Sequence, residues 1–202
     1  FWKTILSKKK LGPNRNHNFK INNQSTFNFI KLNIFPDGGV ARIRLNGIVD
    51  LEKINLSGKN VNLSSILNGS TIVGCNNEHF GKAENVLSPG VGVNMGDGWE
   101  TRRRREPGND WIIIKLATKG LIKKIEIDTA HFKGNYPDQA AVQVSNFDEN
   151  KSLEEIINGS QDWKYILDKS KLQADNIHNY KVDETSTEGV THVRLNIYPD
   201  GG

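Results

Sequence analysis

The sequence predicts an all-β chain that carries parts of two antiparallel β-sandwich domains. Three observations support this fold class. Apolar residues alternate with polar ones in short runs, Gly, Asn and Pro separate these runs, and one long motif occurs twice. Many short strands joined by tight turns are typical of an antiparallel sandwich or jelly roll.

The repeated motif is the strongest pattern in the chain. Residues 29–39 read FIKLNIFPDGG and residues 192–202 read HVRLNIYPDGG, with seven of eleven positions identical. The match continues upstream at Trp2 with Trp163 and at His17 with His178. The offset is 161 upstream and 163 within the motif, so the second copy carries two extra residues between these blocks. A period of this size corresponds to a whole domain.

The repeat sets the expected domain boundaries. We expect residues 1–49 to be the C-terminal part of a first repeat with about four strands, and residues 63–202 to be a second repeat. The segment 50–62 is the expected linker, because residues 55–65 are rich in Asn and Ser. In the first copy the Pro-Asp-Gly-Gly turn leads into an alternating strand, Val40–Leu45. The second copy lacks this last strand and the chain lacks an initial Met, so we expect a chain truncated at both ends.

The second repeat contains the clearest strand signals. Apolar residues alternate with polar ones at 125–127, 142–144 and 193–197, and Asp110–Leu116 is an almost continuous apolar run. We expect a turn at 118–120 after this run. A short helix is expected at Ser152–Asn158, where Ser152 and a glutamate three residues later form a capping box.

Composition narrows the classes of function. The chain has 202 residues, a formal charge of +4 and an isoelectric point near 9.1, a modest basic excess rather than a nucleic-acid footprint. We find no run long enough to cross a membrane and no secretory signal. The single cysteine, Cys75, excludes an internal disulfide and fits a reducing compartment. It lies in an apolar run and is expected to be a small core residue.

The densest polar stretch is Met95–Arg105, which reads MGDGWETRRRR. Its glycines permit a tight loop, Asp97 and Glu100 supply carboxylates, and a guanidinium fork matches the two oxygens of an anionic substrate. Any single arginine here is more often part of a solvated basic edge. The whole loop, with a Trp and two acids, favours a functional site.

A second stretch, Ile125–Asp138, begins as a regular strand and ends as a loop that bears His131, Lys133 and Asn135. Junctions between strands and loops commonly carry site residues. His131 is a candidate for proton transfer near neutral pH, and a hydrogen-bonded structural histidine is the equal alternative. The pair Glu78-His79 is a weaker candidate, because a surface loop explains it as well. The five histidines show no close metal-ligand spacing.

These stretches resemble the allantoicase family. The resemblance is carried by residues 78–81, 85–90, 95–104, 126–135 and 195–202, and it runs over nearly the whole chain. It implies two similar jelly-roll β-sandwich domains of the galactose-binding-like type in each chain. It also implies the hydrolysis of allantoate to ureidoglycolate and urea, in the degradation of allantoin and purines.

The chemistry of this reaction suggests roles for the candidate residues. One ureido nitrogen helps expel the other ureido group as urea, and water then attacks the acylimine-like intermediate. Arg102 or Arg104 would hold the substrate carboxylate. Glu100 and Asp97 would accept ureido hydrogens or act as the base, and His131 would deliver a proton. The remaining expected substrate-binding residues are Asn135, which would orient a ureido carbonyl, Lys133 and His79.

Two rival functions stay open at this point. A non-catalytic ligand- or carbohydrate-binding sandwich would need exposed aromatic residues, of which only Trp99 lies in a suggestive loop. A nucleic-acid-binding domain would use Arg102–Arg105 and would bind with a steep salt dependence. We expect the small molecule allantoate as the ligand, with no nucleic acid, no membrane and a homo-oligomeric assembly. No cofactor is required, a divalent metal stays open, and the expected location is cytoplasmic with the peroxisome as the alternative.

Overall fold

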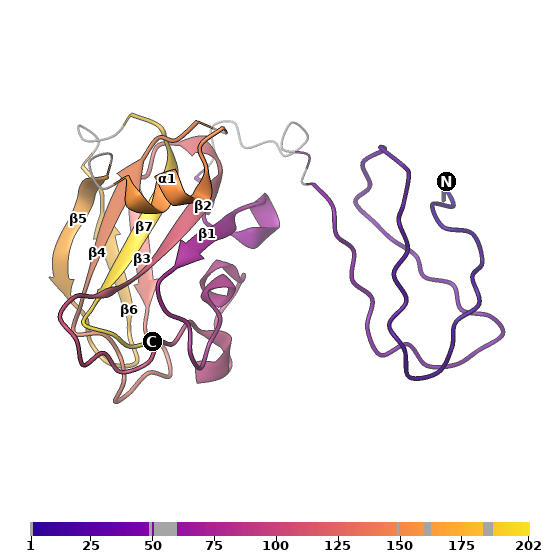
Figure 1. Cartoon of the computed structure of the whole chain (residues 1–202), viewed down its shortest axis with the longest axis horizontal. Helices are drawn as coiled ribbons and strands as arrows, with labels where there is room; N and C mark the ends of the chain where they lie inside the picture. Colours follow the sequence, from indigo (N-terminus) through magenta and orange to yellow (C-terminus); the bar gives the residue numbers. More distant parts are fainter. Residues whose placement is uncertain (1, 49, 51–59, 149, 160–162, 184–187) are drawn as a thin grey trace. The chain divides into compact units, whose positions relative to one another are not determined.

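The computed structural model of the chain describes residues 2–48, 50, 60–148, 150–159, 163–183 and 188–202. The chain divides into two units, Phe1–Asp50 and Leu51–Gly202, and each is treated by itself. Every labelled strand and helix belongs to the second unit (Figure 1). This unit is an antiparallel β-sandwich with very little helix, so the expected fold class is confirmed.

The larger layer of the sandwich is a five-stranded antiparallel sheet with the order β1-β2-β7-β4-β5. Its central strands pair over long registers, since β7 hydrogen-bonds with β2 on one side and β4 on the other. The bounds of these strands are Thr71–Cys75 for β1, Asp110–Gly120 for β2, Gln139–Ser145 for β4, Lys164–Lys171 for β5 and Val190–Tyr198 for β7.

The smaller layer is a pair of antiparallel strands, β3 (Lys124–Asp128) and β6 (Ile177–Lys181). Their inward residues alternate with exposed polar ones, as in a sheet that faces the core on one side. The alternation predicted at 125–127, 142–144 and 193–197 lies in β3, β4 and β7, so these three strand predictions are confirmed.

The core lies on both faces of the five-stranded sheet. On one face Ile112 and Ile114 of β2 pack in the same cluster as Leu87 and Trp99, which lie in the loops before β2. On the other face Ile113 packs with a second cluster of buried residues, Phe147, Ile156 and Trp163. Burial on both faces explains why β2 is an almost continuous apolar run.

One α-helix covers part of the second face, α1 (Leu153–Asn158). Ser152 caps it, and the side chain of Glu155 accepts from the Ser152 backbone in return, so the predicted capping box is confirmed. Three short 3-10 helices lie in the loops, η2 (Ile66–Asn68), η3 (Ala83–Leu87) and η4 (Met95–Asp97).

Two predictions about the second unit need correction. The turn expected at 118–120 is part of β2, because Gly120 still pairs with Val190 of β7 after an irregularity past Lys115. The bend comes later, between β2 and β3. The strands β1, β5 and β6 were not predicted.

The strands expected in the first unit, including Val40–Leu45, are contradicted, since residues 2–48 contain no assigned strand or helix. The repeat offers a physical reason. Residues 2–48 align with β5, β6 and β7, and in the second unit these strands pair with β2, β3 and β4. Residues 2–48 hold no counterpart of β2, β3 or β4, so the backbone groups lack ladder partners.

Local features nevertheless recur in both copies. The backbone N–H of Gly12 donates to His17 Nε2 at 3.0 Å, and that of Gln173 donates to His178 Nε2 at 2.9 Å. The ammonium of Lys8 lies over the Phe35 ring, and that of Lys169 lies over the Tyr198 ring. These pairs occupy equivalent repeat positions. Both a short-range and a longer-range side-chain contact are therefore common to the two copies, whereas β-ladders form in the second only.

Most of the expected linker, residues 51–59, lies outside the described residues. After it, the chain joins the sandwich early. The carbonyl of Leu63 accepts from the backbone N–H of Ala117 at 2.9 Å, and Leu63 packs against the core. Cys75, at the end of β1, is half-buried against the same core.

Candidate functional site

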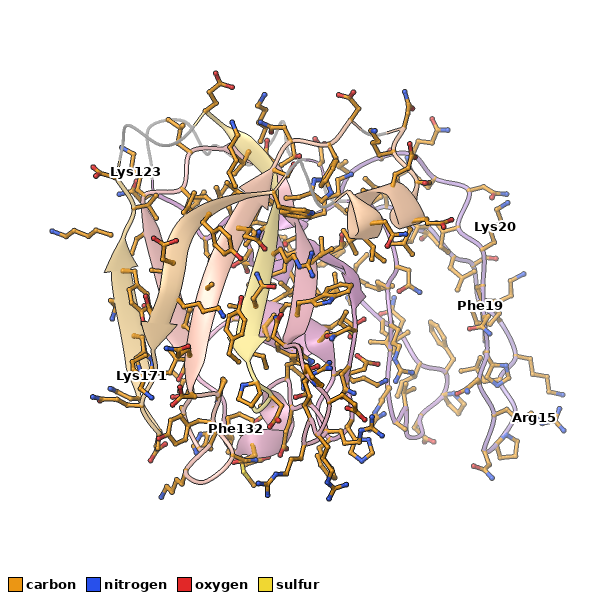
Figure 2. The ribbon with its side chains drawn as sticks, turned by 60° about the vertical axis from the view of Figure 1, so that its left-hand side comes forward. Arg15, Phe19, Lys20, Lys123, Phe132 and Lys171 are labelled. Carbon is orange, nitrogen blue, oxygen red and sulfur yellow. The ribbon has the colours of Figure 1, made fainter. Side chains whose placement is uncertain are left out.

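The loops at one end of the sandwich bring the predicted site residues together. Three segments meet there: residues 92–105, residues 131–137 and the turn 199–202 that follows β7. Phe132 lies at this end, near the C-terminal end of β7 (Figure 2). Its buried ring approaches Gly98 and Gly202 so closely that a Cβ on either glycine would lie within 3 Å of it.

The loop begins with η4, and Asp97 holds this turn in place. The Asp97 carboxylate accepts from the backbone N–H groups of Val93 at 2.7 Å and Asn94 at 3.2 Å. Asn94 in turn caps the helix through the N–H of Gly96. The carboxylate of Asp97 is therefore already engaged in a capping box.

The next residues, 99–105, form an extended segment with two different faces. Trp99 and Thr101 are buried, and Thr101 exchanges backbone and hydroxyl hydrogen bonds with Gly201 of the repeated turn. The indole of Trp99 donates to the Asn77 carbonyl at 2.8 Å, and the ring is 4% exposed. Trp99 is thus a core residue and offers no exposed platform for a sugar.

Glu100 and Arg102 alternate with Trp99 and Thr101, as expected for an extended chain, and the alternation ends at the exposed Arg103. Alternate residues of such a chain lie roughly 7 Å apart. Glu100 Oε1 accepts from the side-chain amide of Asn135 at 2.5 Å. The backbone carbonyl of Asn135 accepts from the N–H of Gly202, which fixes this loop against the turn. The second oxygen of Glu100 has no partner among the described residues.

His131 lies beside the η4 loop. Its Nε2 is 2.9 Å from the Gly92 carbonyl, and because a carbonyl only accepts, Nε2 carries the hydrogen and donates it. The other ring nitrogen, Nδ1, is then left as an acceptor. The backbone of His131 has a left-handed φ of 72°, and its N–H donates to Asp175. Lys133 is exposed and pairs with Asp175 at 3.8 Å.

His79 reaches this region through its backbone. Its N–H donates to the Glu100 carbonyl at 3.0 Å, and its exposed ring packs edge-on against Phe80. The neighbouring Glu78 accepts hydrogen bonds from Lys82 and from the N–H of Ala83, and these lower the pKa of the Glu78 carboxyl. Glu78 is therefore an ordinary solvent-facing ion pair.

The two arginines line a polar cavity of 140 Å³. Arg104 donates to Asp110 Oδ1 at 2.5 Å, and the Asp110 side chain is 1% exposed. The backbone N–H of Arg104 also donates to Asp200 at 2.7 Å. The guanidinium of Arg102 is exposed and has no carboxylate partner in the described part of the chain. The complete lining is Asn76, Asn77, Arg102, Arg104, Glu106 and Asp110.

Sequence reasoning missed Asn76, Asn77 and Asp110. Asp110 was counted only as the first residue of a strand, although a carboxylate that leads an apolar run is a signal for a buried ion pair. Asn76 bridges this region, since it donates to Asp110 Oδ1 and accepts from the N–H of Trp111. Asn77 accepts from the N–H of Arg102 at 2.9 Å.

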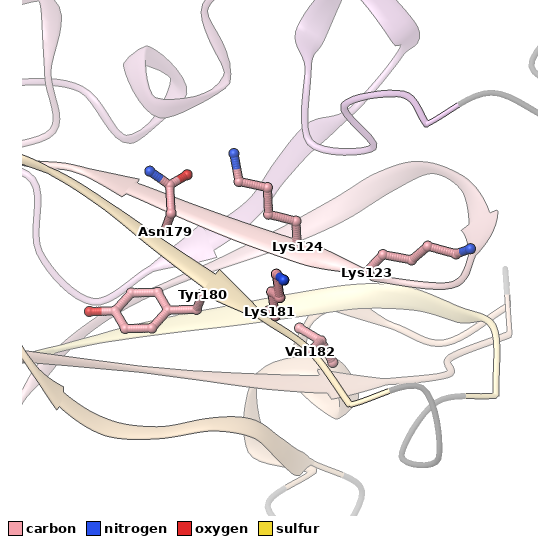
Figure 3. Close-up of a pocket in the computed structure, with 6 residues that line it drawn as sticks. All are labelled: Lys123, Lys124, Asn179, Tyr180, Lys181 and Val182. Carbon is pink, nitrogen blue, oxygen red and sulfur yellow. The ribbon is translucent and has the colours of Figure 1, made fainter.

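A larger groove of 470 Å³ follows β3 and β6 on a different part of the sandwich (Figure 3). Lys124 and Lys181 are directly opposite each other in register there, and burial raises the pKa of the Tyr180 hydroxyl. No carboxylate or histidine lines this groove, so it lacks the acid and base that a hydrolysis needs. Its lining is Lys123, Lys124, Asn179, Tyr180, Lys181 and Val182.

The described residues contain neither a candidate metal-binding cluster nor a membrane-spanning helix. No group of three or more His, Cys, Asp or Glu side chains in the described ranges is placed to hold a metal ion. No helix among them is long and apolar enough to cross a membrane.

Fold and loops together define a β-sandwich domain that carries a polar, loop-built site at one end. A family model described as "Allantoicase repeat" matches residues 1–50 and 61–202. The chain belongs to the allantoicase family.

Individual relatives agree with this assignment. The chain is 45% identical over 201 residues to a probable allantoicase of Acinetobacter baumannii, covering 100% of this chain and 59% of that protein. A probable allantoicase of Burkholderia mallei is 45% identical over 202 residues, with 60% of its length covered. The crystal structure of allantoicase from Saccharomyces cerevisiae superimposes with a TM-score of 0.61 at 36% identity, over 70% of this chain and 40% of that one. The chain thus spans about three fifths of its curated relatives.

Proposed function

We propose that the protein containing this chain hydrolyses allantoate to ureidoglycolate and urea, and that residues 63–202 of the second repeat carry a substrate site. Membership of the allantoicase family supports the reaction. The observation that supports the site is the extended segment 99–105. In it, Asn135 holds the carboxylate of Glu100, and two residues later Arg102 is an exposed guanidinium with no carboxylate partner among the described residues.

The cations of the loop have different parts in this proposal. Arg104 is neutralised by the buried Asp110, so it organises the site. Arg102 is exposed and has no carboxylate partner in the described part of the chain, and a guanidinium binds a carboxylate through two parallel hydrogen bonds. Arg102 therefore holds the substrate carboxylate. Lys133 and His79, both exposed at the same end, add donors at the rim.

The acid and base come from two loops. Glu100 is the base, because Asn135 holds one carboxylate oxygen and leaves the other open. Nε2 of His131 is bound to Gly92, so His131 delivers a proton to the departing urea from Nδ1 when the ring is doubly protonated. Asn135 orients Glu100 through its side-chain N–H. Its side-chain carbonyl then accepts from a ureido N–H. Asp97 supports the loop through its capping box.

The reaction then proceeds in two balanced steps. The C–N bond to one ureido group breaks while the nitrogen of the other ureido group donates its electron pair to the central carbon. The departing nitrogen takes a proton from His131 and leaves as urea. Water adds to the carbon of the resulting protonated acylimine and gives its proton to Glu100. This proton then returns to His131 through solvent, which restores both side chains. The sum is allantoate plus water to ureidoglycolate plus urea.

We also propose the assembly, the partners and the location of the intact protein. We propose a homo-oligomer that acts on a small molecule, without nucleic acid or membrane as partner, in the cytoplasm or the peroxisome. The residues require no cofactor for the steps above. A divalent metal remains a variable of the assay.

The test is the release of urea from allantoate by a protein that carries both repeats at the full length of the relatives. The proposal expects urea and ureidoglycolate in equal amounts, at a rate above that of buffer. The assay is run with chelator and with added divalent metal. A folded protein that releases no urea under either condition would contradict the proposal and favour a non-catalytic ligand-binding sandwich.

A further inference from the structure

The loop that carries His131 is fastened to the turn between β5 and β6, residues 172–176. Thr129, at the start of this loop, is 2% exposed. Its hydroxyl donates to the carbonyl of Gln173 at 2.7 Å and accepts from the backbone N–H of Asn176 at 3.2 Å. Two segments that are distant along the chain are therefore held together just beside His131.

Asp175 is the residue of this turn that binds His131 itself. Its carboxylate accepts from the backbone N–H of His131 at 2.7 Å, and its own N–H donates to the carbonyl of Phe132 at 3.2 Å. A hydrogen bond to an ionised acceptor is stronger than one between neutral groups. The ammonium of Lys133 also lies 3.8 Å from the carboxylate, but this contact is exposed to solvent and adds little.

His131 needs a partner of this kind because of its backbone conformation. Its φ of 72° lies in the left-handed region, which residues other than glycine seldom adopt and which surrounding contacts must hold. The backbone angles set the direction of the Cα–Cβ bond, and therefore where the imidazole points. In this conformation Nε2 reaches the Gly92 carbonyl at 2.9 Å. A contact that holds the backbone of His131 thus also orients its ring.

The repeat separates two properties of Asp175. Asn14 occupies the equivalent position in the first copy and has the same left-handed φ of 50°. Asn and Asp both tolerate this conformation, so the turn does not require a carboxylate. Glycine adopts the same φ without a side chain. The carboxylate of Asp175 can therefore be removed while the turn is kept.

Resting on the proposed function, we infer that Asp175 is a positioning residue for the proton donor His131. Its carboxylate holds the backbone of His131 in the left-handed conformation, and this keeps Nδ1 directed to the departing urea. Asp175 takes no part in the proton transfer and acts only through His131.

The experiment is a double-mutant cycle on kcat for urea release from allantoate, in the full-length protein with both repeats. The variants are Asp175→Gly, His131→Ala and the two combined. Asp175→Gly is expected to lower kcat about tenfold, as for a lost hydrogen bond to a charged group, and to leave KM within about twofold. In the His131→Ala background it is expected to have no further effect on kcat, because no imidazole remains to be positioned. A purely structural role would lower kcat equally in both backgrounds.

Two further variants and one measurement on wild type complete the design. Asp175→Asn keeps an oxygen acceptor and tolerates the left-handed conformation, so it is expected to retain kcat within about threefold. Asp168→Ala removes an exposed carboxylate on β5 and is expected to match wild type. Amide hydrogen exchange at His131 is expected to be slowed in wild type by the bond to Asp175, and it gives the result if Asp175→Gly does not fold.

Three results would overturn the inference and leave the hydrolysis of allantoate intact. They are an unchanged kcat in a folded Asp175→Gly protein, an equal loss of kcat in both backgrounds, and exchange at His131 as fast as in an unfolded chain. A His131→Ala protein with wild-type kcat would remove the proton donor and this inference with it. Absence of urea release by wild type overturns both the proposed function and the role of Asp175.

Discussion

The carboxylate of Glu100 accepts a 2.5 Å hydrogen bond from the side-chain amide of Asn135. The two residues are 35 positions apart and belong to different loops. The repeated turn after β7 holds them in register, because Gly201 binds Thr101 and Gly202 binds the Asn135 carbonyl. The repeated Pro-Asp-Gly-Gly turn thus holds together the two loops that carry the proposed catalytic residues.

Asn135→Ala is expected to lower kcat about tenfold or more, because a hydrogen bond to a charged group contributes about 1.5–3 kcal/mol. KM for allantoate should change much less, since Asn135 mainly positions Glu100 rather than binding the carboxylate. Steady-state kinetics in the full-length protein measure both constants. Equal loss of kcat and of thermal stability would point to a structural role instead. The control is Asn179→Ala, which removes an exposed amide on β6.

His131→Ala is expected to lower kcat by about 10²-fold or more if His131 delivers the proton to urea. The hydrogen bond of the ring to the Gly92 carbonyl is near the surface, so the melting temperature should change little. The measurement is the rate of urea release under saturating allantoate. A kcat close to that of wild type would remove His131 from the mechanism. Asn179→Ala, at an exposed position on β6, is the control.

Arg104→Gln is expected to destabilise the sandwich by about 3 kcal/mol, since it leaves the buried carboxylate of Asp110 without its charged partner. Denaturant unfolding measures this change. Arg103→Gln, at an exposed neighbouring position, should leave the free energy of unfolding unchanged. The double variant Arg104→Gln with Asp110→Asn should recover part of the loss. No recovery would mean that the two charges do not act as a pair.

His192 predicts a pH dependence of stability. Burial, with a smaller effect of nearby Lys115, lowers the pKa of His192 from 6.5 to about 4. The unfolded chain therefore binds the proton more readily than the folded one between these values. The free energy of unfolding should fall as the pH drops from about 6.5 to about 4, and His192 should cause no further change above this window. His192→Gln should flatten this slope in unfolding curves, whereas a slope equal to that of wild type would exclude His192 as its source.

Part of the fold could be predicted because its signals are local. Period-two alternation marked β3, β4 and β7, the apolar run marked β2, and the Ser152 box marked α1. β5 escaped prediction because its ladder with β4 is irregular and most of its residues are exposed, which erases the alternation. The first unit shows the opposite error. An alternating run such as Val40–Leu45 forms a strand only when a partner strand lies beside it.

The sequence indicated which loop carries the candidate site residues, but not which of them are held by other residues. Clustering of acids and arginines marked the loop before Arg105. It did not reveal that Arg104 is neutralised by Asp110 or that Asp97 is used as a helix cap. Those partners depend on contacts between distant or closely folded backbone segments, which residue types alone do not encode. The sequence therefore indicates more candidate residues than the structure leaves free to bind a ligand.

The most direct test of the central claim is the kcat of Glu100→Gln for urea release from allantoate in the full-length protein. The substitution keeps the size of the side chain and removes its ability to take a proton. A general base contributes about 10²–10⁴-fold, so a loss in that range is expected with the melting temperature preserved. Glu106→Gln in the same loop serves as the charge-matched comparison for kcat. A Glu100→Gln protein with near wild-type kcat/KM would contradict the account and move the reaction away from this end of the sandwich.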